Sequence, residues 1–334
     1  MNPIKTVKLF AFKIKRANYK RAWDRAKEAG RLAGKPALLV LLDMLWCSAR
    51  YGAAFTDYFM FRFYERPGRE RREFITMNKN NKLIAFMNDP SKRHLLDKKT
   101  DLVEHFRAYM HREILVLGKT PRGEVVGFIE RHPVLFAKKN YMFSAKGVER
   151  FDCKDYANAE ELYDHIVSAG FDLIEEPIVQ HPDMARLYPG AVNTLRVVTV
   201  LIDDVCDIVF AALKTGNQGT VDNMNAGGLS AAVQVDTGVV YTDGVIKNGG
   251  TYEAHPVTGI VYKGYQIPMW DQVKELVGRA AREVPTIRLV GWDVAITSEG
   301  PILVEGNYLP GYDLLQLPDM TGRMWILRKY MKRA

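Results

Sequence analysis

Apolar and polar residues follow a helical period through the first third of the chain. In residues 4–29 the apolar positions from Ile4 to Ile14 recur every three or four residues, and lysines and arginines occupy the other faces. This pattern predicts a basic amphipathic helix. From residue 37 to about residue 72 the helical pattern continues and is crowded with aromatic residues, which is more typical of a packed core than of a ligand site.

The period changes after residue 124, where short β-rich runs alternate with helical segments. This alternation predicts an α+β or mixed α/β fold, and we take α+β as the class. Glycines punctuate the segment from residue 215 to residue 264, as they do where a backbone approaches a neighbour closely. We expect strands over residues 125–130, 134–138, 173–179, 194–201, 205–213, 288–297 and 301–305, and helices over residues 101–112, 158–168 and 270–283.

Positive charge is concentrated at the start of the chain. The net charge of the 334 residues is +8, and the first 35 residues hold eleven Lys and Arg against only Asp24 and Glu28, so the remainder is close to neutral. The helix over residues 4–29 can therefore lie on an anionic membrane surface, or pack its apolar stripe on its own domain. Nucleic-acid binding is disfavoured, because the charge is confined to one helix without interleaved aromatic residues.

Cysteine content and hydropathy bear on the location of the protein. The three cysteines show no spacing typical of a disulfide scaffold or a structural zinc site, which favours a reducing compartment. The most apolar run, residues 37–47, carries Asp43 and is well short of the roughly 20 residues of a spanning helix. No secretory signal is readable, since basic residues interrupt the start. We expect a cytoplasmic protein, and of the two alternatives for residues 4–29 the first would attach it to the inner face of the membrane.

Common nucleotide-binding and hydrolase motifs are absent. Gly118-Lys119-Thr120 resembles the end of a phosphate-binding loop, but the glycine that this loop requires five residues earlier is Glu113. The chain also lacks a G-x-G-x-x-G turn, a G-x-S-x-G elbow, an H-E-x-x-H zinc motif and a kinase H-R-D loop. Dinucleotide oxidoreductases, serine hydrolases, zinc proteases and protein kinases of the common types are therefore disfavoured.

Two carboxylates and an amide lie on the last two expected strands. Asp293 lies inside the apolar run 289–296, and Glu305 and Asn307 lie at the end of the next strand. A short turn makes these strands a hairpin that sets Asp293 beside Glu305, and a spacing of two keeps Glu305 and Asn307 on one face. Such oxygen donors suit Mg²⁺, with Mn²⁺ as a second choice. The alternative is that they are ordinary solvent-facing residues, but unpaired carboxylates are costly to bury in apolar runs.

Four further segments accompany this pattern, namely Glu175–Pro182, Asn193–Thr199, Asn223–Leu229 and His255–Gly259, and Asp293 itself lies in a fifth, Gly291–Thr297. Together they resemble the ATP-grasp superfamily, and more closely its sugar-transfer-associated family, over most of residues 40–318. The resemblance implies two α+β domains that clamp ATP after a helical, basic N-terminal region. It divides the chain into that region (1–75), a small ATP-grasp subdomain (76–185) and a large subdomain with the metal site (186–334).

The resemblance also implies a set of nucleotide-binding residues. In that family a small-domain lysine contacts the phosphates and precedes a glycine-containing loop, which residues 144–147 match in composition. Lys139 replaces the family's proline, so the choice between Lys138 and Lys139 stays open. The strand over 173–179 resembles the hinge whose backbone binds adenine, and Asp183 is either the later ribose-binding carboxylate or a turn former. The implied residues are Lys98, Lys138, Lys146, Glu175, Glu176, Ile178 and Asp183.

Arg196 and Lys214 are the expected catalytic cations. Arg196 alternates with apolar neighbours on an expected buried strand, where a guanidinium needs an anionic partner. This partner is either a carboxylate in a structural salt bridge or a γ-phosphate or acyl phosphate, and we expect the second. Lys214 ends the following strand. The expected acceptor pocket consists of Asn223, Gly227, Gly228 and His255, although a loop histidine is more often structural.

These residues together lead to an expected reaction. The resemblance implies an ATP- and Mg²⁺-dependent ligase that joins a carboxylate to an amine through an acyl phosphate, releasing ADP and phosphate. The family's description suggests small-molecule or carrier-linked substrates in surface-polysaccharide or glycoconjugate biosynthesis, such as an amino acid and a sugar acid. The alternative is an ATP-grasp phosphotransferase that acts on a hydroxyl group. A non-catalytic nucleotide-binding module is disfavoured, because both the metal-binding residues and the cations are present.

Overall fold

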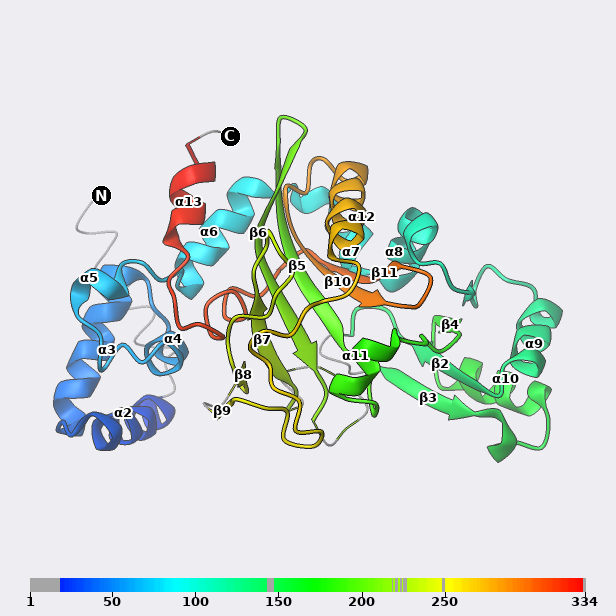
Figure 1. The fold of residues 1–334 in the computed structure, drawn as a ribbon, viewed down its shortest axis with the longest axis horizontal. Coiled ribbons are helices and arrows are strands. Elements are labelled where there is room, and N and C mark those ends of the chain that lie inside the picture. The colour runs from blue at the N-terminus through cyan, green and yellow to red at the C-terminus, as the bar shows by residue number, and fades with distance from the viewer. Residues whose placement is uncertain are drawn as a thin grey trace. The chain divides into compact units, whose positions relative to one another are not determined.

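The computed structural model describes residues 19–142, 147–217, 219, 222, 224, 227–247 and 250–332. The chain divides into two compact units, one formed by Met1–Phe86 with Met320–Arg333 and the other by Met87–Asp319 (Figure 1). Residues 4–18 of the predicted basic helix lie outside the described residues. The described part of that helix begins at Tyr19.

The first unit is helical within its described residues. It consists of α2 (Tyr19–Ala33), α3 (Ala37–Tyr51), α4 (Phe55–Met60), α5 (Gly68–Arg71), α13 (Met324–Tyr330) and most of α6 (Met77–Met87). The aromatic residues form the core that the sequence predicts, with Phe74 lying 4.9 Å from the ring of Phe61 and 5.7 Å from that of Phe63. Trp46 departs from this pattern, because its side chain is exposed on α3.

A partly buried ion pair joins three helices of this unit. Asp43 on α3 accepts hydrogen bonds from both Nη atoms of Arg71 on α5, at 2.7 and 2.8 Å, and from the Tyr58 hydroxyl on α4 at 2.7 Å. Cys47 is fully buried beside this network. Burial raises the pKa of the Cys47 thiol to about 12, so this cysteine stays protonated and unreactive at neutral pH.

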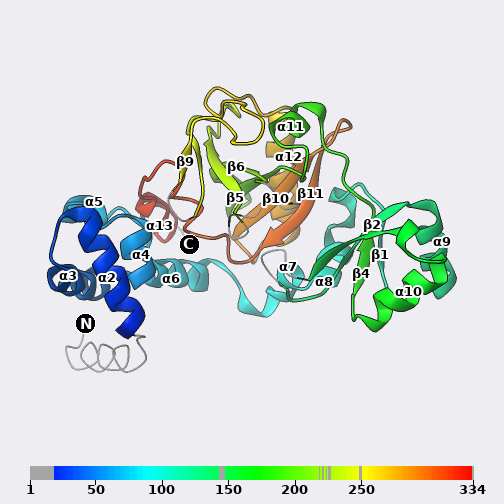
Figure 2. The same cartoon turned by 90° about the horizontal axis from the view of Figure 1, so that it is seen from below.

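The second unit begins with short helices and a four-stranded antiparallel sheet. The spatial order of this small sheet is β1 (Ile114–Val116), β4 (Leu173–Glu175), β2 (Val134–Lys138) and β3 (Val148–Asp152). Its helices are α7 (His94–Asp97), α8 (Lys99–Phe106), α9 (Arg122–Arg131) and α10 (Ala159–Ser168), with 3₁₀ turns at Pro90–Lys92, Arg107–Tyr109 and Cys153–Asp155. Helices α9 and α10 lie beside this sheet in both views (Figures 1 and 2). The core between them contains Leu135, Ala137, Ile174, Phe128, Ile129, Leu162 and Ile166.

The segment 125–130, predicted as a strand, is instead the middle of α9. Its buried side chains, Val125, Phe128 and Ile129, recur at spacings of three and four, which places them on one face of a helix. A run of apolar residues this short fits both periods, so the pattern alone did not distinguish them. Packing against the small sheet selects the helix.

The seven-stranded antiparallel sheet follows in the same unit, with the spatial order β11-β10-β5-β6-β7-β8-β9. Its strands are β5 (Thr194–Ile202), β6 (Val205–Thr215), β7 (Leu229–Val233), β8 (Gly244–Val245), β9 (Thr251–Tyr252), β10 (Leu289–Ile296) and β11 (Pro301–Asn307), and α11 (Pro182–Leu187) precedes them. The predicted helix over 270–283 is confirmed as α12 (Trp270–Glu283), which packs against β5, β6, β10 and β11. The predicted α+β class is also confirmed.

One face of the β10–β11 hairpin packs in the core, and the opposite face carries Asp293. Trp292 on β10 packs against Phe106 of α8, with ring centroids 5.5 Å apart. Because successive side chains of a strand point to opposite faces, Asp293 points away from this contact. Asn88 fixes the start of the strand, since its Nδ2 donates to the Leu289 carbonyl and its Oδ1 accepts from the Leu289 N–H, both at 2.8 Å.

We expect Asn88→Ala to lower the free energy of unfolding by about 2 kcal/mol, because it leaves buried backbone groups of Leu289 without partners. Urea denaturation followed by tryptophan fluorescence measures this change. Lys92→Ala, an exposed neighbour, is the control and is expected to stay within about 0.5 kcal/mol of the wild type. Equal stabilities of the two variants would show that Asn88 does not hold β10.

Candidate active site

Three strands bring the predicted metal-binding residues and Arg196 into one row. Asp293 on β10 is the register partner of Glu305 on β11 and of Arg196 on β5. Paired residues of this kind share a face of the sheet, with Cβ atoms about 5 Å apart. Asn307 is two residues beyond Glu305 and pairs with Gly291, so it lies on the same face.

Asp293 is nearly buried and is neutralised by two cations. Arg196 donates from Nε at 2.6 Å and from Nη2 at 3.1 Å, one hydrogen bond to each carboxylate oxygen, and Lys214 Nζ lies 3.2 Å from Oδ2. Burial acts to raise the pKa of Asp293, but Arg196 and Lys214 outweigh it and hold this pKa below its usual value. Of the two anionic partners considered for Arg196, the structure contains the carboxylate.

Lys214 extends the network to a residue that the sequence analysis did not identify. Its Nζ lies 3.7 Å from Oδ2 of Asp222, which also accepts hydrogen bonds from the N–H and the hydroxyl of Thr194. Residue 228 must be a glycine for the backbone to approach Asp222 this closely, because a Cβ at this position would lie 2.6 Å from the Asp222 carbonyl oxygen. No local pattern marks Asp222, since Thr194, which donates to its carboxylate from both the N–H and the hydroxyl, lies 28 residues away in sequence.

Glu305 lacks the neutralisation that Asp293 has. Among the described residues its carboxylate has no hydrogen-bond or ion-pair partner. Burial, followed by the neighbouring Asp293 carboxylate, raises the pKa of Glu305, and Lys99 only partly offsets this effect. Glu305 is only partly buried, but a carboxylate without a counter-charge beside a second carboxylate still favours an added cation.

The donor set fits a hard divalent cation. Asn307 donates from Nδ2 to the Gly291 carbonyl at 3.2 Å, which leaves Oδ1 as the atom that can bind a ligand. Together with the carboxylates of Asp293 and Glu305, it supplies the oxygen donors that Mg²⁺ prefers. Within the described part of the chain, no group of three or more His, Cys, Asp or Glu side chains is arranged so that it could hold a metal ion.

A second charged cluster lies on the small sheet. Glu175 on β4 forms ion pairs with Lys138 on β2 at 2.5 Å and with Nη2 of Arg112 at 3.0 Å. Burial acts to raise the pKa of Glu175, but Lys138 and Arg112 hold it below its usual value. Arg112 also donates to the Leu303 carbonyl on β11 at 2.9 Å and so connects the two sheets. The sequence analysis did not identify Arg112, because only the tertiary fold brings residue 112 to β11.

The lysines that the resemblance implied differ in their surroundings. Lys138 faces Glu175, whereas Lys139 Nζ lies over the Phe171 ring, 4.8 Å from its centroid. Lys98 forms an ion pair with Asp101 at 2.7 Å. Its neighbour Lys99 donates to the Met142 carbonyl at 2.6 Å and, ahead of Arg196 and Lys138, is the cation that most lowers the pKa of Glu305.

The expected hinge strand ends earlier than predicted. Strand β4 stops at Glu175, because Pro177 has no N–H to donate to a neighbouring strand. Glu176 is held by Glu113, whose carbonyl accepts from the Glu176 N–H at 3.1 Å and whose N–H donates to Glu176 Oε1 at 2.9 Å. Within the described residues, the Glu176 carbonyl and the Ile178 N–H have no hydrogen-bond partner.

His255 is a packing residue in this structure and does not present a nitrogen to a ligand. Its Nε2 hydrogen-bonds to the Gly216 carbonyl at 2.8 Å, and its Nδ1 accepts from the Val257 N–H at 3.2 Å. The ring is buried and stacks on Tyr188 with centroids 5.3 Å apart. Burial lowers the pKa of His255, so the ring is neutral with both nitrogens engaged.

The remaining predicted residues lie in the first turn of a helix, in a loop or outside the described residues. Asp183 is half-exposed at the start of α11, with its carboxylate 3.7 Å from His181 Nδ1 and 3.7 Å from Arg186 Nη1. Gly227 has a left-handed φ of +91°, which favours glycine. Lys146 and Asn223 lie outside the described residues.

Ser230 adds a polar group that the sequence analysis missed. It lies on β7 as the register partner of Lys214, and its buried hydroxyl has no hydrogen-bond partner in the described part of the chain. A buried hydroxyl is normally paired, so this one is available to an oxygen or nitrogen of a bound molecule. A serine inside an apolar strand carries no sequence signal of such a role.

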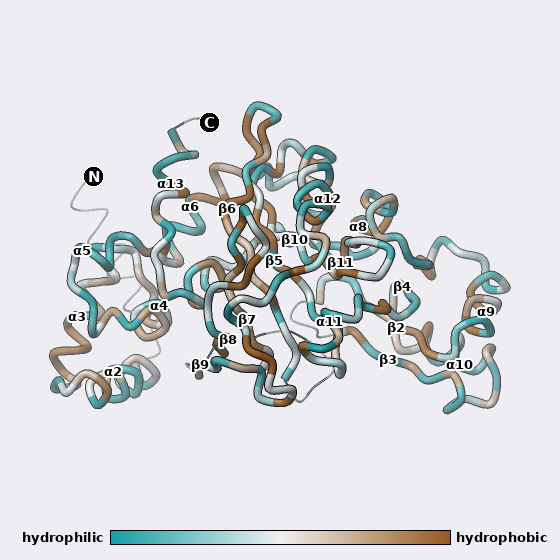
Figure 3. The backbone as a smooth tube through the Cα atoms, in the orientation of Figure 1, coloured by the Kyte–Doolittle hydropathy of each residue, from teal (hydrophilic) through white to brown (hydrophobic). Residues whose placement is uncertain are grey.

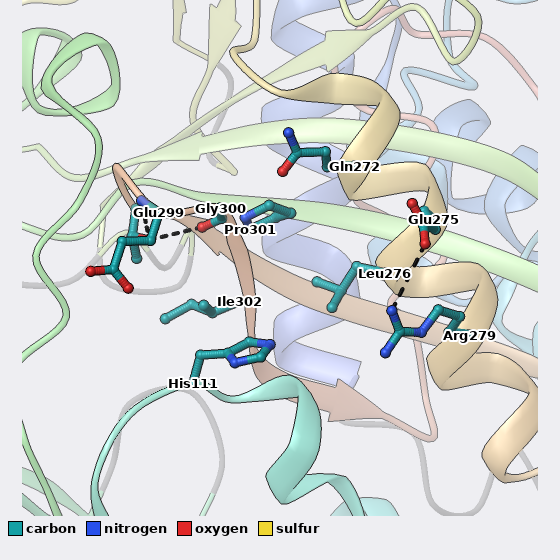
Figure 4. Close-up of a pocket in the computed structure, with 10 residues that line it drawn as sticks. His111, Gln272, Glu275, Leu276, Arg279, Glu299, Gly300, Pro301 and Ile302 are labelled. Carbon is teal, nitrogen blue, oxygen red and sulfur yellow. Dashed lines mark hydrogen bonds and ion pairs between the residues drawn. The ribbon is translucent and has the colours of Figure 1, made fainter.

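A cavity of about 390 Å³ lies apart from these clusters. It is bordered by α12, the turn between β10 and β11, and His111, and it contains none of the predicted site residues (Figure 4). Its lining includes Glu275 and Arg279, which form an ion pair with each other at 3.8 Å. The cavity is therefore distinct from the acidic row on β10 and β11.

Comparison with known proteins identifies one family. The family model described as sugar-transfer associated ATP-grasp matches residues 160–330, just over half of the chain. No curated protein matches the sequence.

Solved structures with similar folds include ATP-grasp ligases and related synthetases. D-cycloserine synthetase DcsG is 12% identical with a TM-score of 0.45, and the match covers 77% of this chain and 80% of that chain. D-alanyl-alanine synthetase A from Vibrio cholerae O1 biovar eltor is 13% identical, with a TM-score of 0.43 and coverages of 72% and 65%. The ATP-grasp ligase PsnB with its minimal precursor is 15% identical, with a TM-score of 0.40 and a coverage of 67% of this chain. The chain spans only 56% of the length of that PsnB chain.

We expect Glu175→Gln to destabilise the protein by about 3 kcal/mol at neutral pH, because it leaves Arg112 and Lys138 buried without their carboxylate. The folded-state pKa of Glu175 is depressed, so its stabilisation is present above its ordinary pKa of 4.5 and is lost as the pH falls through the folded-state value. The difference between variant and wild type in urea denaturation should therefore shrink below that pH. Glu176→Gln, which removes a more exposed carboxylate, is the control, and a pH-independent difference for Glu175→Gln would contradict the ion-pair interpretation.

Proposed function

Because the chain belongs to the sugar-transfer associated ATP-grasp family, we propose that it is an ATP-dependent ligase that joins a carboxylate to an amine. The observation that carries this proposal is the row of Glu305, Asp293 and Arg196, with Lys214 beside it, on one face of the large sheet. It combines an unneutralised acidic edge with two buried cations, as transfer of a phosphoryl group requires.

In this proposal ATP lies between the two sheets of the second unit. The unpaired Glu176 carbonyl and Ile178 N–H bind the edge of the adenine, Asp183 binds the ribose, and Lys138 binds the phosphates. Asp293, Glu305 and Asn307 would hold Mg²⁺, which would supply charge neutralisation for the phosphates of ATP. Nucleotide contacts of Glu175, Lys98 and Lys146 remain predictions, as does the acceptor pocket around Asn223, Gly227 and Gly228.

The reaction then proceeds in two steps. A carboxylate oxygen of the first substrate attacks the γ-phosphorus, the bond to the β,γ-bridging oxygen breaks, and ADP leaves. The amine of the second substrate attacks the acyl carbon, phosphate leaves with the electrons of the acyl–oxygen bond, and the amine proton passes to solvent. Arg196 and Lys214 would neutralise the transferred group, and their contacts with Asp293 of the proposed metal site support this assignment.

The substrate class rests on the family's association with sugar transfer. We propose a carboxylate and an amine of which at least one is a sugar derivative or is linked to a carrier, in surface-polysaccharide or glycoconjugate assembly. A cytoplasmic enzyme that contacts an anionic membrane through residues 4–29 suits carrier-linked substrates. The basic residues of this segment support the contact.

The function is tested by measuring ADP, AMP and phosphate released from ATP and Mg²⁺ in the presence of pools of amino acids, uronic acids and amino sugars. We expect pool-dependent ADP and phosphate with a product whose mass equals the two substrates less water. Glu305→Gln should reduce this rate by about a thousandfold while the protein stays folded, because no ion pair is lost. ADP with a phosphorylated product would instead identify a phosphotransferase, and AMP would contradict the acyl phosphate.

A pair of adjacent lysines tests the position of the nucleotide. We expect Lys138→Met to weaken ATP binding by about tenfold or more, because it removes a partly buried cation from the phosphate site. Lys139→Met should leave affinity within about threefold, because this lysine lies over Phe171. Isothermal titration with ATP and Mg²⁺ measures both, and the reverse order of effects would move the phosphate contact to Lys139.

A further inference from the structure

Helix α3 exposes a continuous apolar face. Its opposite face buries Val40, Met44, Cys47 and Tyr51 in the core of the first unit. The exposed arc consists of Leu38, Leu39, Leu42, Trp46 and Ala49, and the four large side chains are 55–59% exposed. At 100° per residue these five positions fall within about 100° of one another, with no polar residue among them. The helix is therefore apolar on both faces, which is unusual in water.

Cations flank this apolar face. Lys27, Arg31 and Lys35 are exposed on α2 and on the turn that leads into α3, and Arg50 is exposed near the end of α3. Lys27 lies over the ring of Trp23, which is itself exposed on α2. Figure 3 shows α3 as a largely brown segment next to the more hydrophilic α2. The surface thus combines an apolar stripe, tryptophan and a basic flank, which is the composition of elements that bind the membrane interface.

The bend between α2 and α3 bears on how this region can contact a membrane. Among the described residues no single helix is long and apolar enough to cross a membrane. The pair Ala22–Ala33 and Ala37–Tyr51 passes on length and composition together, but the two helices meet at an angle of 111°. A bent pair of this kind suits burial at the depth of the headgroups, where a helix lies along the surface.

We propose that the α2–α3 corner docks on an anionic lipid surface, with the Leu38–Trp46 face of α3 buried in the acyl boundary and the basic residues of α2 at the headgroups. A protein partner fits less well, because interfaces between proteins combine an apolar centre with a polar rim of mixed charge, and acidic residues are sparse here. This proposal extends the membrane contact proposed for residues 4–29 to α3. It rests on that proposal only in taking an anionic membrane as the partner.

The test uses the full chain and vesicles of phosphatidylcholine alone or mixed with phosphatidylglycerol, with binding measured by co-sedimentation. We expect binding to the mixed vesicles, and a loss of about tenfold or more in the double variant Leu42→Glu/Trp46→Glu, which places two anions on the docking face. Both side chains are more than half exposed, so the variant should fold, as circular dichroism will verify. Val205→Glu replaces an exposed apolar residue of the second unit and is expected to bind like the wild type.

Three outcomes would overturn the proposal. Unchanged binding by the double variant would show that α3 is not part of the contact. If a chain lacking residues 1–18 also failed to bind, the contact proposed for residues 4–29 would hold without α3. Equal binding to both vesicle types removes the anionic requirement. Absence of vesicle binding together with a dimer that the double variant abolishes assigns the face to a second copy. ADP release with soluble substrates is measured in parallel, so that failure of the ligase function is distinguished from failure of docking.

Discussion

The arrangement of the large sheet depends on the burial of one carboxylate, that of Asp293. Its two cations come from β5 and β6, so the order of these strands and their register are constrained together. A shift of β10 by one residue would turn Asp293 to the opposite face and leave Arg196 and Lys214 without it. With Asp222 the network holds two anions and two cations and is neutral. Glu305 stands outside this balance.

The two charged clusters of the second unit carry excess charges of opposite sign. On the large sheet Glu305 adds one negative charge to a neutral network, and on the small sheet Arg112 and Lys138 share the single carboxylate of Glu175. A molecule that is cationic at one end and anionic at the other complements both. A magnesium–nucleotide has this polarity, which is the electrostatic reason for the proposed ATP site.

The large-sheet hairpin could be predicted from the sequence because its determinants are local. A short turn between two apolar runs sets the pairing of Asp293 with Glu305, and the amphipathic period sets the bounds of α12. The strand predicted for residues 125–130 was wrong, because a short apolar run fits both the helical and the strand period. Arg112 was not identified because Glu175 lies 63 residues away in sequence, and Asp222 was not identified because Thr194, which donates to it, lies 28 residues away. The backbone partners of both His255 ring nitrogens could not be predicted either, because a sequence does not reveal which backbone groups engage an imidazole.

Arg112 has a mechanical consequence. One guanidinium holds a carboxylate of the small sheet and a backbone carbonyl of β11, so it acts as a joint between the two sheets. A rotation of one sheet about this side chain can keep both hydrogen bonds, whereas sliding one sheet past the other stretches at least one of them. Sliding is therefore opposed, because a hydrogen bond to a charged group contributes about 1.5–3 kcal/mol. Relative movement of the sheets is therefore biased toward a hinge rather than a shear, with the pivot set at the edge strand that carries Glu305.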